Sequence, residues 1–149
     1  MITDADMPEG YLLRATTAEL LVIVDAEHPD LLLDGELDDR GDLVFSVKAV
    51  DSETGRRGTV QGWVLFDLRV CHFGGRMRSI TAFWTSETNY EMFRKLLAEG
   101  ATIHEAASNT WTATQAQRHG FLAVIVIPLT ATSPKDSVMV KFIRTRNAP

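Results

Sequence analysis

The residues best suited to chemistry lie in the second half of this 149-residue chain. Phosphodiester cleavage needs a group that moves a proton, a cation that stabilises charge on the phosphoryl oxygens, and polar groups that position the substrate. His119 and Arg118 supply the first two, and Thr112 and Asn89 supply a hydroxyl and an amide. These four residues form our candidate catalytic set for metal-independent RNA cleavage by the 2′-hydroxyl. The structural alternative makes Arg118 and His119 a solvated last helical turn, where cations favour the negative end of the helix dipole.

Three further residues are candidates for substrate binding. Trp111 stands between Thr110 and Thr112, which suits a platform on which a base stacks beside hydroxyl groups. Thr110 is the second candidate, and the basic side chain of Arg78 is the third. Alternatively, Trp111 fills the core and one of the threonines caps a helix.

Other combinations of reactive residues predict no established chemistry. Cys71 and His72 are neighbours on an expected helix and point about 100° apart, so we expect Cys71 to be a small buried side chain. A zinc-binding HExxH motif at His104 would need a second histidine where Ser108 stands. The P-loop, GxGxxG and GxSxG motifs are absent. We therefore predict no metal and no cofactor.

Charge is divided unevenly along the chain. Residues 1–53 hold 14 acids and 3 bases, a net charge of −11, and residues 54–149 hold 6 acids and 12 bases, a net charge of +6. This division disfavours a protein that is basic throughout and binds nucleic acid over its whole surface. The acidic part could instead shield the basic part.

Composition favours one globular domain over residues 1–149, with flexible ends at residues 1–9 and 147–149. Hydrophobic residues make up 45% of the chain, and its one cysteine forms no disulfide within it. We find neither a signal peptide nor an apolar run of membrane-spanning length. We expect a cytoplasmic protein without a membrane partner, secreted only if another domain or machine carries it.

The elements that must position these residues follow from hydrophobic patterning. In the acidic part, three strands are predicted at Leu20–Ala26, Leu31–Leu37 and Leu43–Val50, and the turn residues Asp38–Gly41 join the last two. A helix capped by Thr59 and ended by Gly74 and Gly75 is then expected to bury an aromatic stripe of Trp63, Phe66, Val70 and Phe73.

Short helices and strands alternate in the rest of the chain. We expect a strand at Met77–Trp84, a helix from Ser86 to Gly100, a helix with a capping box at Thr102–Glu105, a short helix after Thr112, a strand covered on both faces at Phe121–Leu129 and a last strand at Val138–Phe142. The order βββ, α, β, ααα, ββ predicts an α+β fold. It consists of an N-terminal antiparallel β-meander, central helices and a C-terminal β-hairpin, with one layer of helices on a mostly antiparallel sheet.

About half of the chain resembles a module at the C-terminal ends of bacterial polymorphic toxins of the Rhs and filamentous-haemagglutinin kinds, also found in small stand-alone bacterial proteins. The resemblance rests on Leu65-Phe66, His72-Phe73-Gly74, Ile80 to Trp84, Asn89 with Phe93, Glu105-Ala106-Ala107, Thr110-Trp111-Thr112, Ala116 and Gly120-Phe121, in that order. The sequence departs from the module at Ala113, where a glycine usually follows the threonine. The resemblance implies a bacterial toxin or effector context and carries no assigned chemistry.

Three functions fit these observations, and the sequence does not decide whether the protein is an enzyme. The first is a toxin-like or effector-like domain that cleaves RNA. The second is a non-catalytic module that binds a protein, such as an immunity protein or a secretion carrier, through the acidic meander or a basic helical face. The third is an ADP-ribosyltransferase-like activity. Tyr11–Arg14 and Phe83–Ser86 suggest it, because these segments are similar to strands of ADP-ribosyltransferases. The late glutamate of those enzymes is missing, since no Glu follows Glu105 and Asp136 is the only later acid. The oligomeric state is left open.

Overall fold

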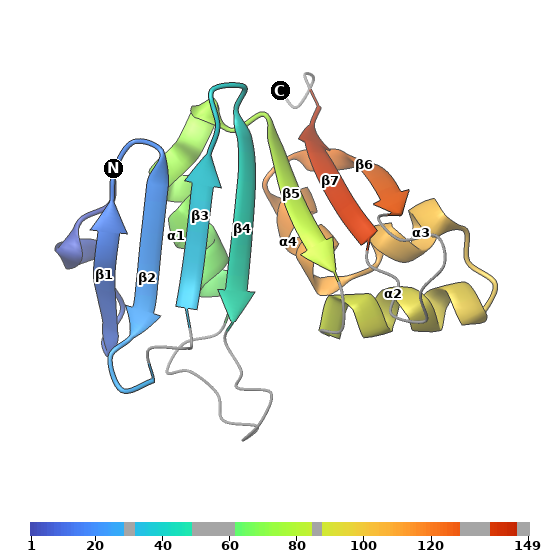
Figure 1. Cartoon of the computed structure of the whole chain (residues 1–149), viewed down its shortest axis with the longest axis horizontal. Coiled ribbons are helices and arrows are strands. Elements are labelled where there is room, and N and C mark those ends of the chain that lie inside the picture. The colour runs from blue at the N-terminus through green and yellow to red at the C-terminus, as the bar shows by residue number, and fades with distance from the viewer. Residues whose placement is uncertain (29–31, 49–61, 85–87, 129–137, 146–149) are drawn as a thin grey trace. The chain divides into compact units, whose positions relative to one another are not determined.

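The structure is a computed structural model that describes residues 1–28, 32–48, 62–84, 88–128 and 138–145 (Figure 1). The fold is α+β, as the sequence predicts, and its strands pair in antiparallel fashion within each of two compact units. These units are Met1–Arg78 and Ser79–Pro149. The single domain expected from the sequence stays a prediction.

The first unit is an antiparallel meander with the strand order β1-β2-β3-β4. Its elements are η1 (Asp4–Asp6), β1 (Tyr11–Thr16), β2 (Leu20–Asp25), β3 (Leu32–Leu37), β4 (Asp42–Lys48), α1 (Gly62–Phe73) and η2 (Gly74–Arg76). Helix α1 packs on β3 and β4, and it lies behind the meander in Figure 1. Leu21, Ile23, Leu33 and Leu43 are fully buried in this unit.

Strand β1 is absent from the predicted order, which begins with three strands where the structure has four. Tyr11 is buried and pairs with Asp25, and the register between β1 and β2 shifts at Arg14. The residues before β1, expected to form a flexible end, include the buried Ile2, whose N–H donates to Nδ1 of His72. The anchor is a histidine 70 residues away, so no local pattern indicates it.

The turn between β3 and β4 forms at the predicted residues. The Asp38 carboxylate accepts hydrogen bonds from the N–H groups of Arg40, at 2.9 Å, and Asp42, at 2.8 Å. Gly41 has φ +83°, and a Cβ added there would lie 2.7 Å from the carbonyl oxygen of Arg76. The turn therefore requires glycine both for its conformation and for this close approach.

Helix α1 buries half of the predicted aromatic stripe, because Phe66 and Phe73 are buried as expected whereas Trp63 and Val70 are not. Its buried residues, at spacings of three and four, are Leu65, Phe66, Arg69, His72 and Phe73. Trp63 is exposed and Val70 is only half-buried. Cys71, expected to be buried, is exposed as well. The predicted cap Thr59 and the end of the third predicted strand lie outside the described residues, whereas the helix ends at Gly74 as predicted.

The second unit is a three-stranded antiparallel sheet with the order β5-β7-β6 and three short helices. Its elements are β5 (Ser79–Trp84), α2 (Thr88–Ala98), α3 (Ile103–Ser108), α4 (Trp111–Arg118), β6 (Phe121–Pro128) and β7 (Val138–Arg144). The Thr102 capping box of α3 is confirmed. Helix α4 begins at Trp111, earlier than predicted, because Thr110 caps it. The predicted cap Ser86 lies outside the described residues.

Helices α3 and α4 pack on β6, and small side chains line their buried faces. Ala106, Ala107, Ala113 and Ala116 are fully buried. Strand β6 was expected to be covered on both faces. It is instead the last strand in the order, and Ile125 and Ile127 are exposed on the face that the helices leave open. An apolar strand thus lies at an edge of this sheet.

No helix in the described part of the chain is long and apolar enough to cross a membrane.

Candidate functional site

Thr110, Thr112 and Asn89 meet at the N-terminal end of α4, where the side chains of Thr110 and Asn89 hold the first turn of the helix. The Thr110 hydroxyl donates to the carbonyl of Ala107, at 3.1 Å, and accepts the N–H of Ala113, at 3.2 Å. Oδ1 of Asn89 accepts the N–H of Thr112, at 3.0 Å. Both threonines are buried. These groups satisfy backbone N–H groups that every helix leaves unpaired in its first turn.

Arg118 and His119 lie at the other end of the same helix. Nη1 of Arg118 donates to Oε1 of Gln115, at 2.5 Å, and the backbone N–H groups of His119 and Gly120 close the last turn on the carbonyls of Ala116 and Gln117, respectively. Seven residues separate Thr112 from His119, which is about 10 Å along a helix. The four candidate catalytic residues therefore form two pairs at opposite ends of α4.

The remaining substrate-binding candidates belong to different units. Trp111 is the first residue of α4 and is 38% exposed, so it does not fill the core, a role that the buried Trp84 takes in this unit. Its exposed ring is compatible with stacking. Arg78 belongs to the first unit, where its N–H donates to the carbonyl of Gly41, at 2.7 Å, and its side chain is exposed.

The division into units redistributes the charge. Residues 1–78 hold 15 acids and 8 bases, a net charge of −7, and residues 79–149 hold 5 acids and 7 bases, a net charge of +2. Five of the arginines that make residues 54–149 basic therefore belong to the acidic first unit. The unit that carries α4 has only a small positive charge, which gives it a weak general attraction for nucleic acid.

The burial of Arg69 was not predicted from the sequence, because arginine side chains are mostly exposed. The Arg69 side chain is fully buried on the inner face of α1, and none of its three guanidinium nitrogens has a hydrogen-bond partner among the residues that the structure describes. The guanidinium carbon lies 3.4 Å from the ring centroid of Phe45 and 4.0 Å from that of Phe66. Burial lowers the pKa of Arg69 well below its ordinary value, and the charge of Asp34 opposes this shift. Gly35 makes room for the side chain, since a Cβ there would lie 3.3 Å from Cδ of Arg69.

His72 is the second buried polar group of α1, and its hydrogen bonds define its tautomer. Nε2 donates to the carbonyl of Thr17, at 2.7 Å, and Nδ1 accepts the N–H of Ile2, at 3.3 Å. A carbonyl only accepts and an N–H only donates, so the neutral ring carries its proton on Nε2. Burial lowers the pKa of His72, with smaller contributions from the N-terminal ammonium and Arg76, while the bond to Thr17 opposes the shift.

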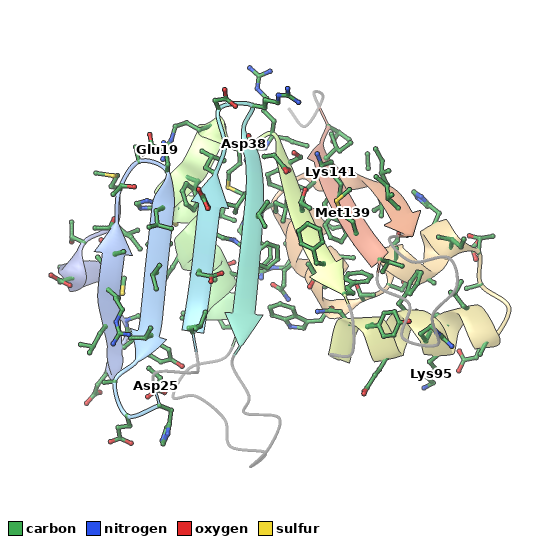
Figure 2. The ribbon with its side chains drawn as sticks, in the orientation of Figure 1. Glu19, Asp25, Asp38, Lys95, Met139 and Lys141 are labelled. Atoms are coloured by element: carbon green, nitrogen blue, oxygen red, sulfur yellow. The ribbon has the colours of Figure 1, made fainter. Side chains whose placement is uncertain are left out.

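The open face of the second sheet gathers exposed apolar side chains. The register places Ile127, Met139 and Phe83 in one row across the three strands. The next row holds Ile125 and Lys141, and the one after it Ala123 and Ile143, paired across β6 and β7. Phe83 is 50% exposed, Ile125 45% and Ile127 42%. Figure 2 shows Met139 and Lys141 along β7 within this face. We call Phe83, Ala123, Ile125, Ile127, Met139 and Ile143 the apolar face.

Metal-ligating side chains do not cluster in the described ranges of the chain, where no three His, Cys, Asp or Glu side chains could hold a metal ion together. Histidine and carboxylate side chains there instead support backbone turns. The Asp25 carboxylate, for example, accepts the N–H groups of Glu27 and His28.

Comparisons with known proteins assign no family. No family model matches the sequence, and no curated protein matches it significantly. Among solved structures, a "putative phosphinothricin N-acetyltransferase" is similar, with a TM-score of 0.44 and 17% identity over 87% of this chain and 74% of that chain. This similarity is too low to transfer a fold family or an activity.

Proposed function

We propose that this chain is a non-catalytic protein-interaction module that binds a partner protein through the apolar face of its second unit. The observation that carries the proposal is the alignment of the exposed Phe83, Ile125 and Ile127 with the half-buried Met139 in adjacent rows of the second sheet. Apolar side chains that are exposed singly are common on soluble proteins, whereas contiguous apolar patches typically mark binding surfaces.

The same face indicates the chemistry of the partner. A partner surface rich in aliphatic and aromatic side chains would remove Phe83, Ile125 and Ile127 from water. Lys141 lies beside the apolar face, opposite Ile125, and the second unit has a net charge of +2, so acidic residues at the rim of the partner surface would be complementary. This mode of binding does not require the acidic meander or the basic helical face, which the sequence suggested as binding surfaces.

RNA cleavage stays a prediction with less support from the geometry. The side chains of Thr110 and Asn89 already hold the first turn of α4, and Arg118 and His119 lie about 10 Å away along the helix. A general acid or base must lie within hydrogen-bond reach of the reacting proton, directly or through one water. This separation disfavours joint action of the four residues on one phosphodiester.

The test compares two matched variants, Phe83→Asp on the apolar face and Leu12→Asp on β1 of the first unit. The two native side chains are similarly exposed, at 50% and 54%. Each form is immobilised and exposed to an extract of the source organism. Mass spectrometry then identifies proteins that the wild type retains and Phe83→Asp does not. The leading one is then purified and titrated against all three forms.

We expect Phe83→Asp to weaken binding of the purified partner by about tenfold or more, because a charge replaces a buried aromatic contact. Leu12→Asp should bind as the wild type does, and circular dichroism should show that both variants are folded. Equal binding by all three forms, or no partner whose retention depends on Phe83, would refute the proposal.

A further inference from the structure

Strand β6 has one backbone edge that no described strand pairs. It is the last strand in the order β5-β7-β6 and pairs with β7 along its other edge. In an antiparallel strand, every second residue directs its N–H and C=O groups toward that outer side. Such a row of donors and acceptors is a template for one more strand.

The usual protections of an edge strand are weak here. Residues Phe121–Pro128 contain no charged side chain. The register shift at Leu122 and the terminal Pro128 affect only the ends, and Ala123–Ile127 pair residue by residue with β7. The outer strand of the first unit differs, because β1 carries the charged Arg14 at its register shift. The edge of β6 therefore remains suited to pairing.

We propose that β6 pairs antiparallel with β6 of a second copy of this chain, about a two-fold axis at Ile125. In this register Ile125 lies opposite its own copy, Val124 opposite Val126, and Ala123 opposite Ile127. Each pair joins residues of the same face, since residues 124 and 126 lie on one side of the strand and 123, 125 and 127 on the other. Because all of these side chains are apolar, β6 is complementary to its own copy, as an interface with two-fold symmetry requires.

Charge does not oppose this pairing. Lys141 is the charged residue nearest the axis in the sheet, because it lies opposite Ile125 on β7. The two copies of Lys141 would be three strand spacings apart, about 14 Å, which exceeds the screening length of about 8 Å at physiological salt. One pair of short strands buries less area than a standard interface, so we expect a reversible dimer with a dissociation constant of roughly micromolar size.

The register gives the proposal a specific test by charge exchange at position 125. In the Ile125→Lys variant two lysines face each other across the axis, and in the Ile125→Glu variant two glutamates do so. A mixture of the two variants places Lys opposite Glu. The control is Phe83→Lys, which adds the same charge to the same sheet on β5, away from the edge. Mass is measured by analytical ultracentrifugation over a range of concentrations.

We expect the wild type and Phe83→Lys to reach twice the monomer mass of 16.6 kDa. Each variant at position 125 should dimerise about tenfold more weakly alone, and the mixture should recover a heterodimer. A monomeric wild type, a dimer that survives both substitutions, or a mixture that stays monomeric would overturn the proposal. Phe83→Lys separates this proposal from the proposed function, because it alters partner binding and leaves the dimer intact.

Discussion

Arg69 places a cation in the apolar layer between α1 and strands β3 and β4. A buried charge without a hydrogen-bond partner costs several kcal/mol. Contacts of the guanidinium with the rings of Phe45 and Phe66 contribute about 0.5–2 kcal/mol each and offset part of this cost. At this residue, charge burial and aromatic packing act in opposite directions.

We predict that Arg69→Met raises the free energy of unfolding by about 1–4 kcal/mol, because Met fills a similar volume without a charge. Urea denaturation followed by circular dichroism measures the change. The control Arg76→Met removes an exposed guanidinium that donates to the carbonyl of Ala18 and should change stability by about 1 kcal/mol or less. A large loss of stability in Arg69→Met would show that the charge has an important partner.

His72 makes stability depend on pH. Its pKa is lowered in the folded state from the ordinary value of 6.5, so the unfolded chain takes up the proton first as pH falls. The contribution of neutral His72 is fully present above pH 6.5 and is lost as pH falls from there toward the lower folded pKa. Protonation of Nδ1 would also break the hydrogen bond from Ile2.

We therefore expect the wild type to be less stable to urea at about pH 5.5 than at about pH 7.5, with a weaker pH dependence in His72→Gln. The matched control is His104→Gln, since His104 is exposed on α3, and it should follow the wild-type profile. Identical pH profiles for the wild type and His72→Gln would contradict this assignment.

At the scale of elements, α4 is held by hydrogen bonds at its first turn, and one of these connects it to α2. Replacing Asn89 by Ala leaves the N–H of the buried Thr112 without this acceptor, at a cost of about 1–3 kcal/mol. Asn89→Asp keeps an acceptor oxygen and should lose less stability. Urea denaturation distinguishes the two, and equal stability of Asn89→Ala and the wild type would exclude a structural role for this bond.

Local chemistry in the sequence predicted several elements well. The Asp38–Gly41 turn and the Thr102 capping box need only neighbouring residues, and both form. The face of α1 was predicted only in part: Phe66 and Phe73 are buried as expected, but Arg69 and His72 are buried against their residue type and Trp63 is exposed. For the candidate site, the sequence located Thr110 and Asn89 in one region. Their hydrogen bonds to the first turn of α4 depend on tertiary placement that spacing alone does not give.

At the scale of the molecule, charge is divided less sharply between the two units than between residues 1–53 and 54–149 of the sequence. The second unit carries a net charge of +2, and the first carries −7. Binding to nucleic acid at physiological salt typically involves several phosphate contacts by Lys and Arg. The whole chain is therefore poorly suited to binding RNA without sequence preference.

We predict that the purified chain leaves RNA intact and does not retain it at about 0.15 M salt. Gel analysis of total RNA and a filter-binding assay measure the two properties. The double variant Arg118→Ala, His119→Ala should be indistinguishable from the wild type in both. RNA cleavage by the wild type that is absent from the double variant would restore the catalytic assignment of these residues.

The strand order β5-β7-β6 also has a consequence for synthesis. The ribosome releases β5, three helices and β6 before β7, yet β7 is the strand that lies between the other two. All four strands of the meander have been synthesised once residue 48 is added, whereas the second sheet is complete only after residues 138–144. Without β7, the uncharged segment Phe121–Ile127 lacks its only neighbouring strand among the described residues of its unit, and an unpaired apolar strand is prone to aggregation. A premature stop codon before residue 138 would make this unpaired state permanent.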